Sequence, residues 1–326
     1  ARSMAPIEAF CQKNEVEHKA TTVTKLTKDE AILADGTTVT FDACVVATGA
    51  HMKWALTGRG TGETSRASRL ETLKKEGAKI LKASRVLVVG GGLVGVEVAG
   101  DVKAHAAKQG NKDIKVTLVH SGDRLCPEMA ASASAMVKRQ LEKCGIKIVL
   151  NDKAVEMADG TYALQSSGEV VSAEIVIPTT GLKACNDFVD IEGSKIDSGF
   201  LDTDDFFRVN NAGGKVFAIG DCCTTLPNAG SQVMQNSGAI GTNLFATIQA
   251  VQKRESLAEL KLQKFSLGPP VKCVTTSLDT GVADLGCTYT QYMLPSFKQN
   301  TMFFFSPKQM LGMDTDGTTT TAQVIA

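Results

Sequence analysis

The chain has 326 residues, 43% of them hydrophobic, and its 35 Lys and Arg residues balance 35 Asp and Glu residues. This length suits two or three domains, and the balanced charge argues against a nucleic-acid partner, because binding phosphates needs surplus cations. Nine scattered cysteines without a CxxC pair favour neither a disulfide framework nor a zinc site. We therefore expect a packed α/β protein without a metal, in a reducing intracellular compartment, with an organelle or membrane surface left open. No apolar run reaches the length of a membrane span.

The first segment with a clear pattern, residues 36–49, reads GTTVTFDACVVATG. It has a glycine, an acidic residue six positions later, and an apolar run that ends in Thr48 and Gly49. This order predicts a hairpin that leads into a buried strand.

A glycine-rich turn follows in residues 85–100, RVLVVGGGLVGVEVAG. The apolar run Val86–Val89 is typical of a buried parallel strand. The turn after it satisfies G-x-G-x-x-G, with its glycines at Gly90, Gly91, Gly92 and Gly95. In such a turn the glycines permit the sharp bend, the approach of a pyrophosphate and close helix–strand packing, so we expect a dinucleotide here.

The elements after the turn complete a βαβ unit. A helix is predicted with Val94, Val98 and Val102 on one face, and a strand is predicted over Ile114–Val119. In NAD-binding proteins this second strand ends in an acid that binds the ribose 2′-hydroxyl.

Here the second strand ends instead in His120, and Arg124 follows within a few residues. A missing carboxylate and two candidate cations would tolerate a 2′-phosphate, so we expect NADPH to be accepted. The alternative interpretation is that His120 is an ordinary residue at a surface strand end.

Residues 168–181, GEVVSAEIVIPTTG, repeat the pattern of residues 36–49, and both segments place their end glycines thirteen positions apart. Two matching segments predict two copies of one design. The glycine turn at Gly90 precedes Gly168 by 78 positions, and the same interval before Gly36 falls ahead of Ala1. We therefore expect a first βαβ unit with its own G-x-G-x-x-G, at least ~40 residues before Ala1.

A third apolar strand is predicted at residues 216–221, VFAIGD, and ends in Gly220 and Asp221. A carboxylate at a strand end can accept a hydrogen bond from a ribityl hydroxyl, which favours a second nucleotide. The helical run Ser231–Lys253 follows.

The four motifs VVATG, VVGGGLVGVE, IVIPTTG and VFAIGD, in this order, resemble the two-dinucleotide-binding FAD/NAD(P)H pyridine-nucleotide oxidoreductases. Within this family the chain is most similar to the apoptosis-inducing-factor-like (ferroptosis-suppressor-type) branch and the type II NADH dehydrogenases. The resemblance implies an α/β fold of two Rossmann-like domains, one inserted in the other and the first incomplete, and a small α+β C-terminal domain. It also implies FAD, NAD(P)H and hydride transfer to the flavin.

The resemblance assigns roles to residues that match the motifs. Gly90, Gly92 and Gly95 would hold the NAD(P)H pyrophosphate, Glu97 would lie near the nicotinamide, and Gly181 would close that pocket. Thr48, Gly49, Gly220 and Asp221 would face FAD. Gln235 would lie near the flavin and the acceptor, although an ordinary polar helix face explains it equally simply.

The predicted domain boundaries follow from these motifs. Residues 1–84 and 183–262 form the FAD-type domain, residues 85–182 form the NAD(P)H-binding domain, and residues 263–326 form the C-terminal interface domain. Strands are expected near Val271–Ser277 and Met302–Phe305 in the last of these.

The expected function is flavin-dependent oxidation of NAD(P)H with a quinone or another small electron acceptor. Two alternatives stay open: a non-catalytic structural subunit of a larger assembly, and a flavoprotein reductase of an electron-transfer protein. Peripheral membrane association or membership of a larger complex is compatible with each of them.

Overall fold

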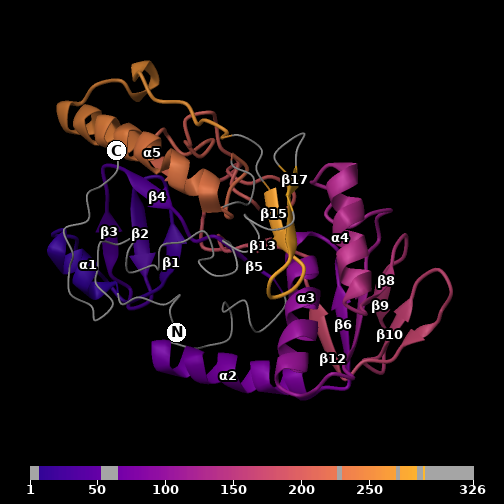
Figure 1. Ribbon diagram of the computed structural model, residues 1–326. Coiled ribbons are helices and arrows are strands. Elements are labelled where there is room, and N and C mark those ends of the chain that lie inside the picture. Colours follow the sequence, from indigo (N-terminus) through magenta and orange to yellow (C-terminus); the bar gives the residue numbers. More distant parts are fainter. Residues whose placement is uncertain (1–6, 53–64, 226–229, 269–271, 285–288, 291–326) are drawn as a thin grey trace. The chain divides into compact units, whose positions relative to one another are not determined.

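The computed structural model describes residues 7–52, 65–225, 230–268, 272–284 and 289–290 (Figure 1). Contacts divide the chain into two units. Unit 1 comprises Ala1–His18, Lys53–Gly181 and Pro270–Ala326, and unit 2 comprises Lys19–Met52 and Leu182–Pro269. The chain therefore leaves unit 2 for the long middle segment of unit 1 and then returns, which is the insertion expected of this fold class.

Unit 1 is built on a parallel sheet with the strand order β12-β6-β7-β8 (Figure 1). The strands are β6 (Arg85–Val89), β7 (Lys115–Val119), β8 (Lys147–Val149) and β12 (Ile175–Pro178). The other described elements of unit 1 are α1 (Glu8–Lys13), α2 (Arg66–Lys82), α3 (Leu93–Lys108), α4 (Ala131–Lys143), β9 (Ala154–Glu156), β10 (Tyr162–Leu164), β11 (Val170–Val171), β15 (Lys272–Thr275), β16 (Gly281–Asp284) and β17 (Tyr289–Thr290). The predicted strand–turn–helix–strand unit is present as β6, α3 and β7.

Both faces of this sheet are covered, as a parallel sheet requires. Val86 and Val88 of β6 pack with apolar residues of α3 and α4, whereas Leu87 packs on the other face with residues of the antiparallel sheet β9–β11. Leu87 and Val88 are fully buried. The apolar run in the sequence thus reflects a strand with two buried faces.

The buried face of α3 differs in part from the predicted face. Val96 and Ala99 are fully buried, but Val94 is 43% exposed. The buried stripe includes Gly95, Val96, Ala99, Val102 and Ala106. The predicted face is wrong at Val94 only, because Val102 is buried and Val98 packs against the core. Glycine and alanine, which carry little apolar surface, allow the helix to approach the sheet closely on the side of Gly95 and Ala99.

A hairpin of β15 and β16 packs on α3 and α4 within unit 1 and contributes Val274 and Val282 to its core. A Cβ atom at Gly100 of α3 would lie 2.3 Å from the backbone oxygen of Thr276, so only glycine permits this approach. The boundary drawn at residue 263 stays a prediction, and the expected strand Met302–Phe305 lies outside the described residues.

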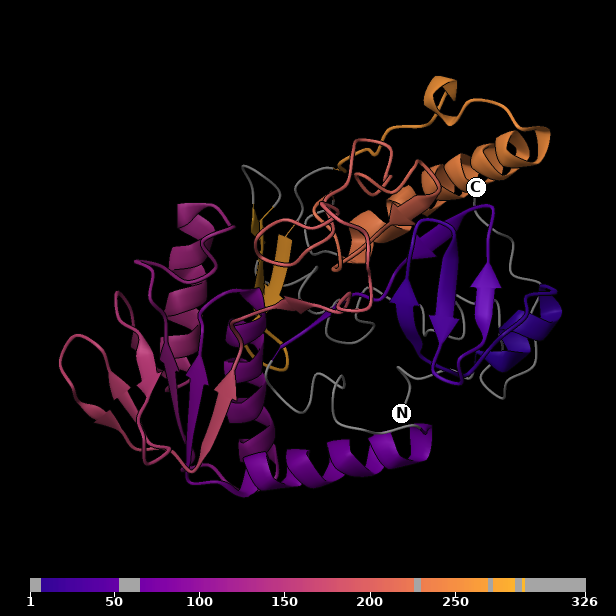
Figure 2. The same cartoon turned by 180° about the vertical axis from the view of Figure 1, so that it is seen from behind.

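Unit 2 contains a three-stranded antiparallel sheet, β1-β2-β3, and two parallel strands, β14 and β4 (Figure 2). Its elements are β1 (Val23–Leu26), β2 (Glu30–Leu33), β3 (Thr38–Thr40), β4 (Cys44–Val46), β5 (Ala50–His51), β13 (Lys183–Ala184), β14 (Val216–Ala218), α5 (Gly230–Lys253) and the 3-10 helix η2 (Leu257–Glu259). Buried Asn236 and Asn243 of α5 each exchange two backbone hydrogen bonds with the segment 263–266.

The predicted repeat is present in the two units. In unit 2, β3 is the last strand of an antiparallel sheet and leads into β4, which pairs in parallel with β14. In unit 1, β11 occupies the corresponding place after β9 and β10 and leads into β12, which pairs in parallel with β6. The thirteen-residue spacing therefore marks one supersecondary design used twice.

Candidate nucleotide-binding site

The glycine turn joins β6 to the start of α3. Gly90 has φ +112°, a conformation that side chains strongly disfavour, and its N–H donates to the Val119 oxygen over 2.8 Å. A Cβ atom at Gly95 would lie 1.8 Å from the Gly90 oxygen. These contacts fix the turn against β7 and draw the first turn of α3 against the strand end.

Gly92 has different surroundings. It is the N-cap of α3, and a Cβ atom there would have no neighbour nearer than 4.0 Å. Its backbone is therefore open at the start of the helix, although the first N–H of α3, that of Leu93, donates to the Glu128 carboxylate over 3.2 Å. The structure accordingly fits an anion at this point, because a helix N-terminus offers unpaired donors and a positive partial charge.

Thr179 fastens the neighbouring strand to this turn. Its hydroxyl lies 2.9 Å from the Val89 oxygen and 3.0 Å from the Gly90 oxygen, and its N–H donates to the Val89 oxygen over 2.8 Å. The Thr-Thr-Gly motif at the end of β12 therefore positions the glycine turn, a role that sequence reasoning did not assign to Thr179.

His120 follows β7 and contacts the glycine turn directly. The Gly91 N–H donates to its Nδ1 over 3.1 Å, so the neutral imidazole carries its proton on Nε2. Partial burial lowers the pKa of His120, although Glu128 and Asp123 oppose this effect. At neutral pH His120 is therefore an uncharged imidazole, not the cation that the sequence suggested.

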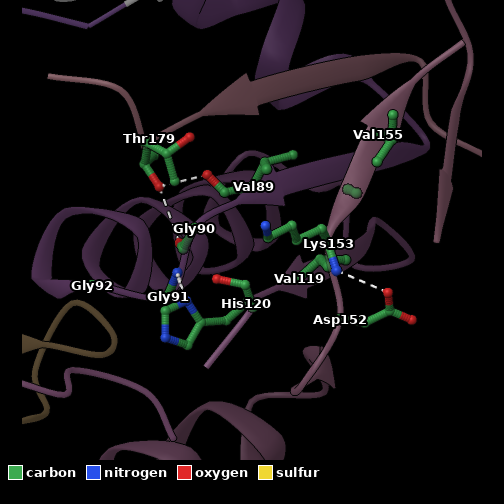
Figure 3. A pocket seen from close by; sticks show the side chains of 13 residues that line it. Val89, Gly90, Gly91, Gly92, Val119, His120, Asp152, Lys153, Val155 and Thr179 are labelled. Atoms are coloured by element: carbon green, nitrogen blue, oxygen red, sulfur yellow. Dashed lines mark hydrogen bonds between the residues drawn. The ribbon is translucent and has the colours of Figure 1, made fainter. Parts of the chain in front are cut away.

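A cavity of about 580 Å³ opens beside the glycine turn (Figure 3). It is lined by Val89, Gly90, Gly91, Gly92, Val119, His120, Ser121, Asp152, Lys153, Ala154, Val155, Thr179 and Thr180. Asp152 is held by the Ser166 hydroxyl and by the N–H groups of Lys153 and Ser166, and the Ser166 hydroxyl lowers its pKa. This leaves Lys153 as an exposed cation at the wall.

Sequence reasoning missed Lys153, although its position just after β8 was a signal, since strand ends of a parallel sheet meet at one edge. Four residues with predicted roles here do not line the cavity: Gly95, which packs against Gly90, and Arg124, Glu97 and Gly181. The Arg124 guanidinium donates to the Pro127 oxygen, and Glu97 accepts from the N–H of Thr275. Their nucleotide roles stay predictions.

The predicted FAD residues lie together in unit 2 around the ends of β4 and β14. Gly49 and Gly220 both have positive φ, at +66° and +83°, and Asp221 is half-buried after them. Gln235 is an exposed residue of α5, as an ordinary polar helix face would have it. The described part of unit 2 contains no G-x-G-x-x-G turn.

Two buried polar atoms of the described chain have no hydrogen-bond partner: Thr48 Oγ1 and His120 Nε2. Each belongs to a residue with a predicted cofactor role, one in each unit. Because buried polar atoms in folded proteins are nearly always paired, an orphaned one indicates a partner that the protein itself does not provide. Both sites therefore fit bound cofactors.

The structure offers no other evident site of these kinds in its described part. No helix there is long and apolar enough to span a membrane. No group of three His, Cys, Asp or Glu side chains among the described residues could hold a metal ion.

The glycine turn, the parallel sheet covered on both faces, and the insertion of one unit into the other define a two-dinucleotide-binding flavoprotein reductase fold. The pattern of the pyridine nucleotide-disulphide oxidoreductase family matches residues 4–241, and the chain belongs to this family, whose cofactors are FAD and NAD(P)H.

Individual relatives agree with this assignment. The chain is 24% identical over 305 residues to ferroptosis suppressor protein 1 of Xenopus tropicalis, covering 90% of this chain and 77% of that protein. It is 29% identical over 222 residues to the nitric oxide reductase FlRd-NAD(+) reductase of Vibrio vulnificus, covering 66% of this chain and 56% of that protein. Among solved structures, a ferredoxin reductase of Rhodopseudomonas palustris matches with TM-score 0.60 and 18% identity, covering 86% of this chain and 67% of that one.

Proposed function

We propose that this protein oxidises NAD(P)H and passes the electrons through FAD to a quinone-type acceptor. The observation that carries the proposal is the pair of orphaned polar atoms, Thr48 Oγ1 and His120 Nε2, one at each predicted cofactor site. FAD, when bound, supplies the hydride-accepting and electron-passing chemistry. The similarity to ferroptosis-suppressor-type flavoproteins favours a quinone as the acceptor.

The residues of the chain itself bind and orient the two cofactors. The open backbone at Gly92 and the N–H groups at the start of α3 receive the pyrophosphate of NAD(P)H, which takes the place of the Glu128 carboxylate on the Leu93 N–H, and Thr179 holds that turn in place. The Thr48 hydroxyl and the Asp221 carboxylate provide partners for the flavin side of unit 2. No titrating protein base is needed, so alignment and electrostatics are the contribution of the protein.

We infer that NADPH is the preferred nucleotide. No acid takes the place of His120 directly after β7, although Asp123 and Glu128 lie within electrostatic reach of His120 and Asp152 lines the same cavity. The neutral His120 has an Nε2–H donor without a hydrogen-bond partner, and Lys153 places a cation on the cavity wall. A phosphate oxygen would satisfy both. The position of Lys153 thus supplies the attraction that the sequence had assigned to Arg124.

The proposal is tested by steady-state oxidation of NADPH and NADH by the full-length protein with a ubiquinone analogue as acceptor. We expect turnover with the quinone and a lower KM for NADPH. Lys153→Gln should raise the KM for NADPH and leave that for NADH unchanged, whereas Lys147→Gln, on the same sheet but outside the cavity lining, should change neither. Flavin-containing protein that oxidises NAD(P)H but not with quinones would overturn the choice of acceptor.

A second candidate acceptor is an electron-transfer protein, because one relative is named nitric oxide reductase FlRd-NAD(+) reductase. This candidate predicts slow turnover with quinones and rapid turnover with a small redox protein. The same assay with both acceptors separates the two proposals.

A further inference from the structure

Unit 2 contains a thiol–imidazole pair that the proposed chemistry does not use. The Nδ1 atom of His51 lies 3.2 Å from the Sγ atom of Cys185, and both side chains are half-buried. The short ladder of β5 and β13 sets this distance, since His51 pairs with Lys183 and the Cys185 N–H donates to the Gly49 oxygen over 2.8 Å. Backbone pairing therefore holds His51 and Cys185 next to each other.

The charged groups beside the pair belong to the same segment. Lys183 forms an ion pair with Asp187 over 2.9 Å, and His51 and Lys195 also lie within electrostatic reach of Asp187 and help to lower its pKa, an effect in which Lys183 is the largest cause. The imidazole thus contacts a thiol and has a carboxylate within electrostatic reach. In this arrangement it can take the thiol proton while the carboxylate favours the resulting imidazolium.

The other half-buried thiols of the described chain have less favourable surroundings. Burial raises the pKa of Cys44 to about 11 and also raises the pKa of Cys144. The remaining described thiols, Cys11, Cys126, Cys222, Cys223 and Cys273, are buried. Among them the Cys223 thiol lowers the pKa of Cys222 to about 7, but Cys222 has no exposed surface. Cys185 therefore combines partial access to solvent with an adjacent base, the two conditions that select a reactive cysteine.

We propose that Cys185 and His51 form a covalent modification site for α,β-unsaturated carbonyl compounds. The proton of Cys185 moves to the unprotonated Nδ1 of His51, and Sγ forms a bond to the β-carbon of the electrophile. The carbon–carbon π pair forms a new double bond to the carbonyl carbon, whose own π pair moves onto oxygen to give an enolate, and the His51 imidazolium returns the proton to the α-carbon. No oxidant or reductant takes part, because the product is a thioether adduct that contains all atoms of both reactants.

The test is a short pulse of substoichiometric N-ethylmaleimide on the full-length protein with its flavin, followed by peptide mass mapping of each cysteine. We expect Cys185 to react about tenfold faster than Cys44 and Cys144. His51→Asn should slow Cys185 about fivefold and leave Cys144 unchanged. The matched control is His105→Asn, since His105 is an exposed histidine of α3 in the other unit and should have no effect.

Equal labelling of Cys185 and Cys144 in the unaltered protein would overturn the proposal, and so would an unchanged Cys185 rate in His51→Asn. Labelling of the buried Cys126 and Cys222 reports whether the variant has kept its fold. If His51→Asn and His51→Gln both expose those thiols, the ratio of the Cys185 labelling rate to the Cys144 labelling rate in the unaltered protein decides. A ratio below about threefold contradicts the role of His51. The outcome is independent of quinone turnover.

Discussion

Gly92 and Gly95 occupy one turn but meet opposite surroundings, and this difference yields the first prediction. Gly95→Ala places a Cβ atom against the backbone of Gly90 and should destabilise the fold by about 3 kcal/mol. Gly92→Ala has open space and should cost less than about 1 kcal/mol, yet its methyl group occupies the pyrophosphate side. Thermal unfolding measures the loss of stability expected for Gly95→Ala, and NADPH titration measures the loss of binding expected for Gly92→Ala. Equal unfolding temperatures for the two variants would contradict the stability prediction.

His120 gives a pH prediction at the same scale. Its pKa in the folded protein is lowered by burial, so its stabilising contribution is present above the ordinary value of about 6.5 and is lost as the pH falls through the folded value. Protonation also turns Nδ1 into a donor that cannot accept the Gly91 N–H. We expect the free energy of unfolding, measured with urea, to fall more steeply between pH 7.5 and pH 5.5 than in His120→Gln. If the free energies of unfolding of the two proteins fell in parallel with pH, the His120 imidazole would not contribute to the stability of the glycine turn.

The same residue tests nucleotide choice. His120→Glu adds a negative charge at the end of β7, where it should repel a 2′-phosphate and accept from a free 2′-hydroxyl. We expect the kcat/KM ratio of NADPH to NADH to fall by roughly tenfold, which corresponds to about 1–2 kcal/mol. An unchanged ratio would mean that His120 does not face the ribose.

Whether the sequence predicts the role of a single residue depends on what determines its position. The glycines of the turn were predictable because backbone geometry admits no other residue there. The neutral state of His120 and the wall position of Lys153 were not, because they depend on a contact with Gly91 and on the loop after β8, which no local pattern encodes.

Among the elements, the hairpin β15–β16 depends on α3 for its place. Gly100→Ala should push the hairpin away, because a Cβ atom would lie 2.3 Å from the Thr276 oxygen, and should destabilise unit 1 by about 2 kcal/mol. The control is Gly77→Ala on α2, where nothing lies within 4 Å, and it should stabilise the protein by up to about 1 kcal/mol. Hydrogen exchange of residues 272–284 measures the detachment directly, and unchanged protection in Gly100→Ala would refute the docking argument.

The strands were predictable as elements because β6, β7 and β12 are apolar runs ended by turn residues, and α5 was predictable from the long run before Lys253. The exposure of Val94 on α3 was not, because close packing by Gly95 and Ala99 outweighs the apolar pattern at that position. The attachment of β15–β16 to unit 1 also escaped prediction, since it rests on a contact between residues more than a hundred positions apart.

At the scale of the whole molecule, the same hairpin-and-strand design occurs in both units, so that one chain contains two predicted cofactor sites. Each copy ends in a Thr-Gly pair, and each unit keeps one buried polar atom without a partner of its own. A protein that only filled a structural place in an assembly would have no need to leave those atoms unpaired, because an unpaired buried polar atom costs free energy.

The central claim is that electrons pass from NADPH to a bound flavin in this protein. The most direct measurement is the visible absorbance of the purified full-length native protein before and after anaerobic addition of NADPH, followed by a quinone. We expect flavin absorbance that is bleached by NADPH and restored by the quinone. A colourless native protein, or a bound flavin that neither NADPH nor NADH reduces, would contradict it.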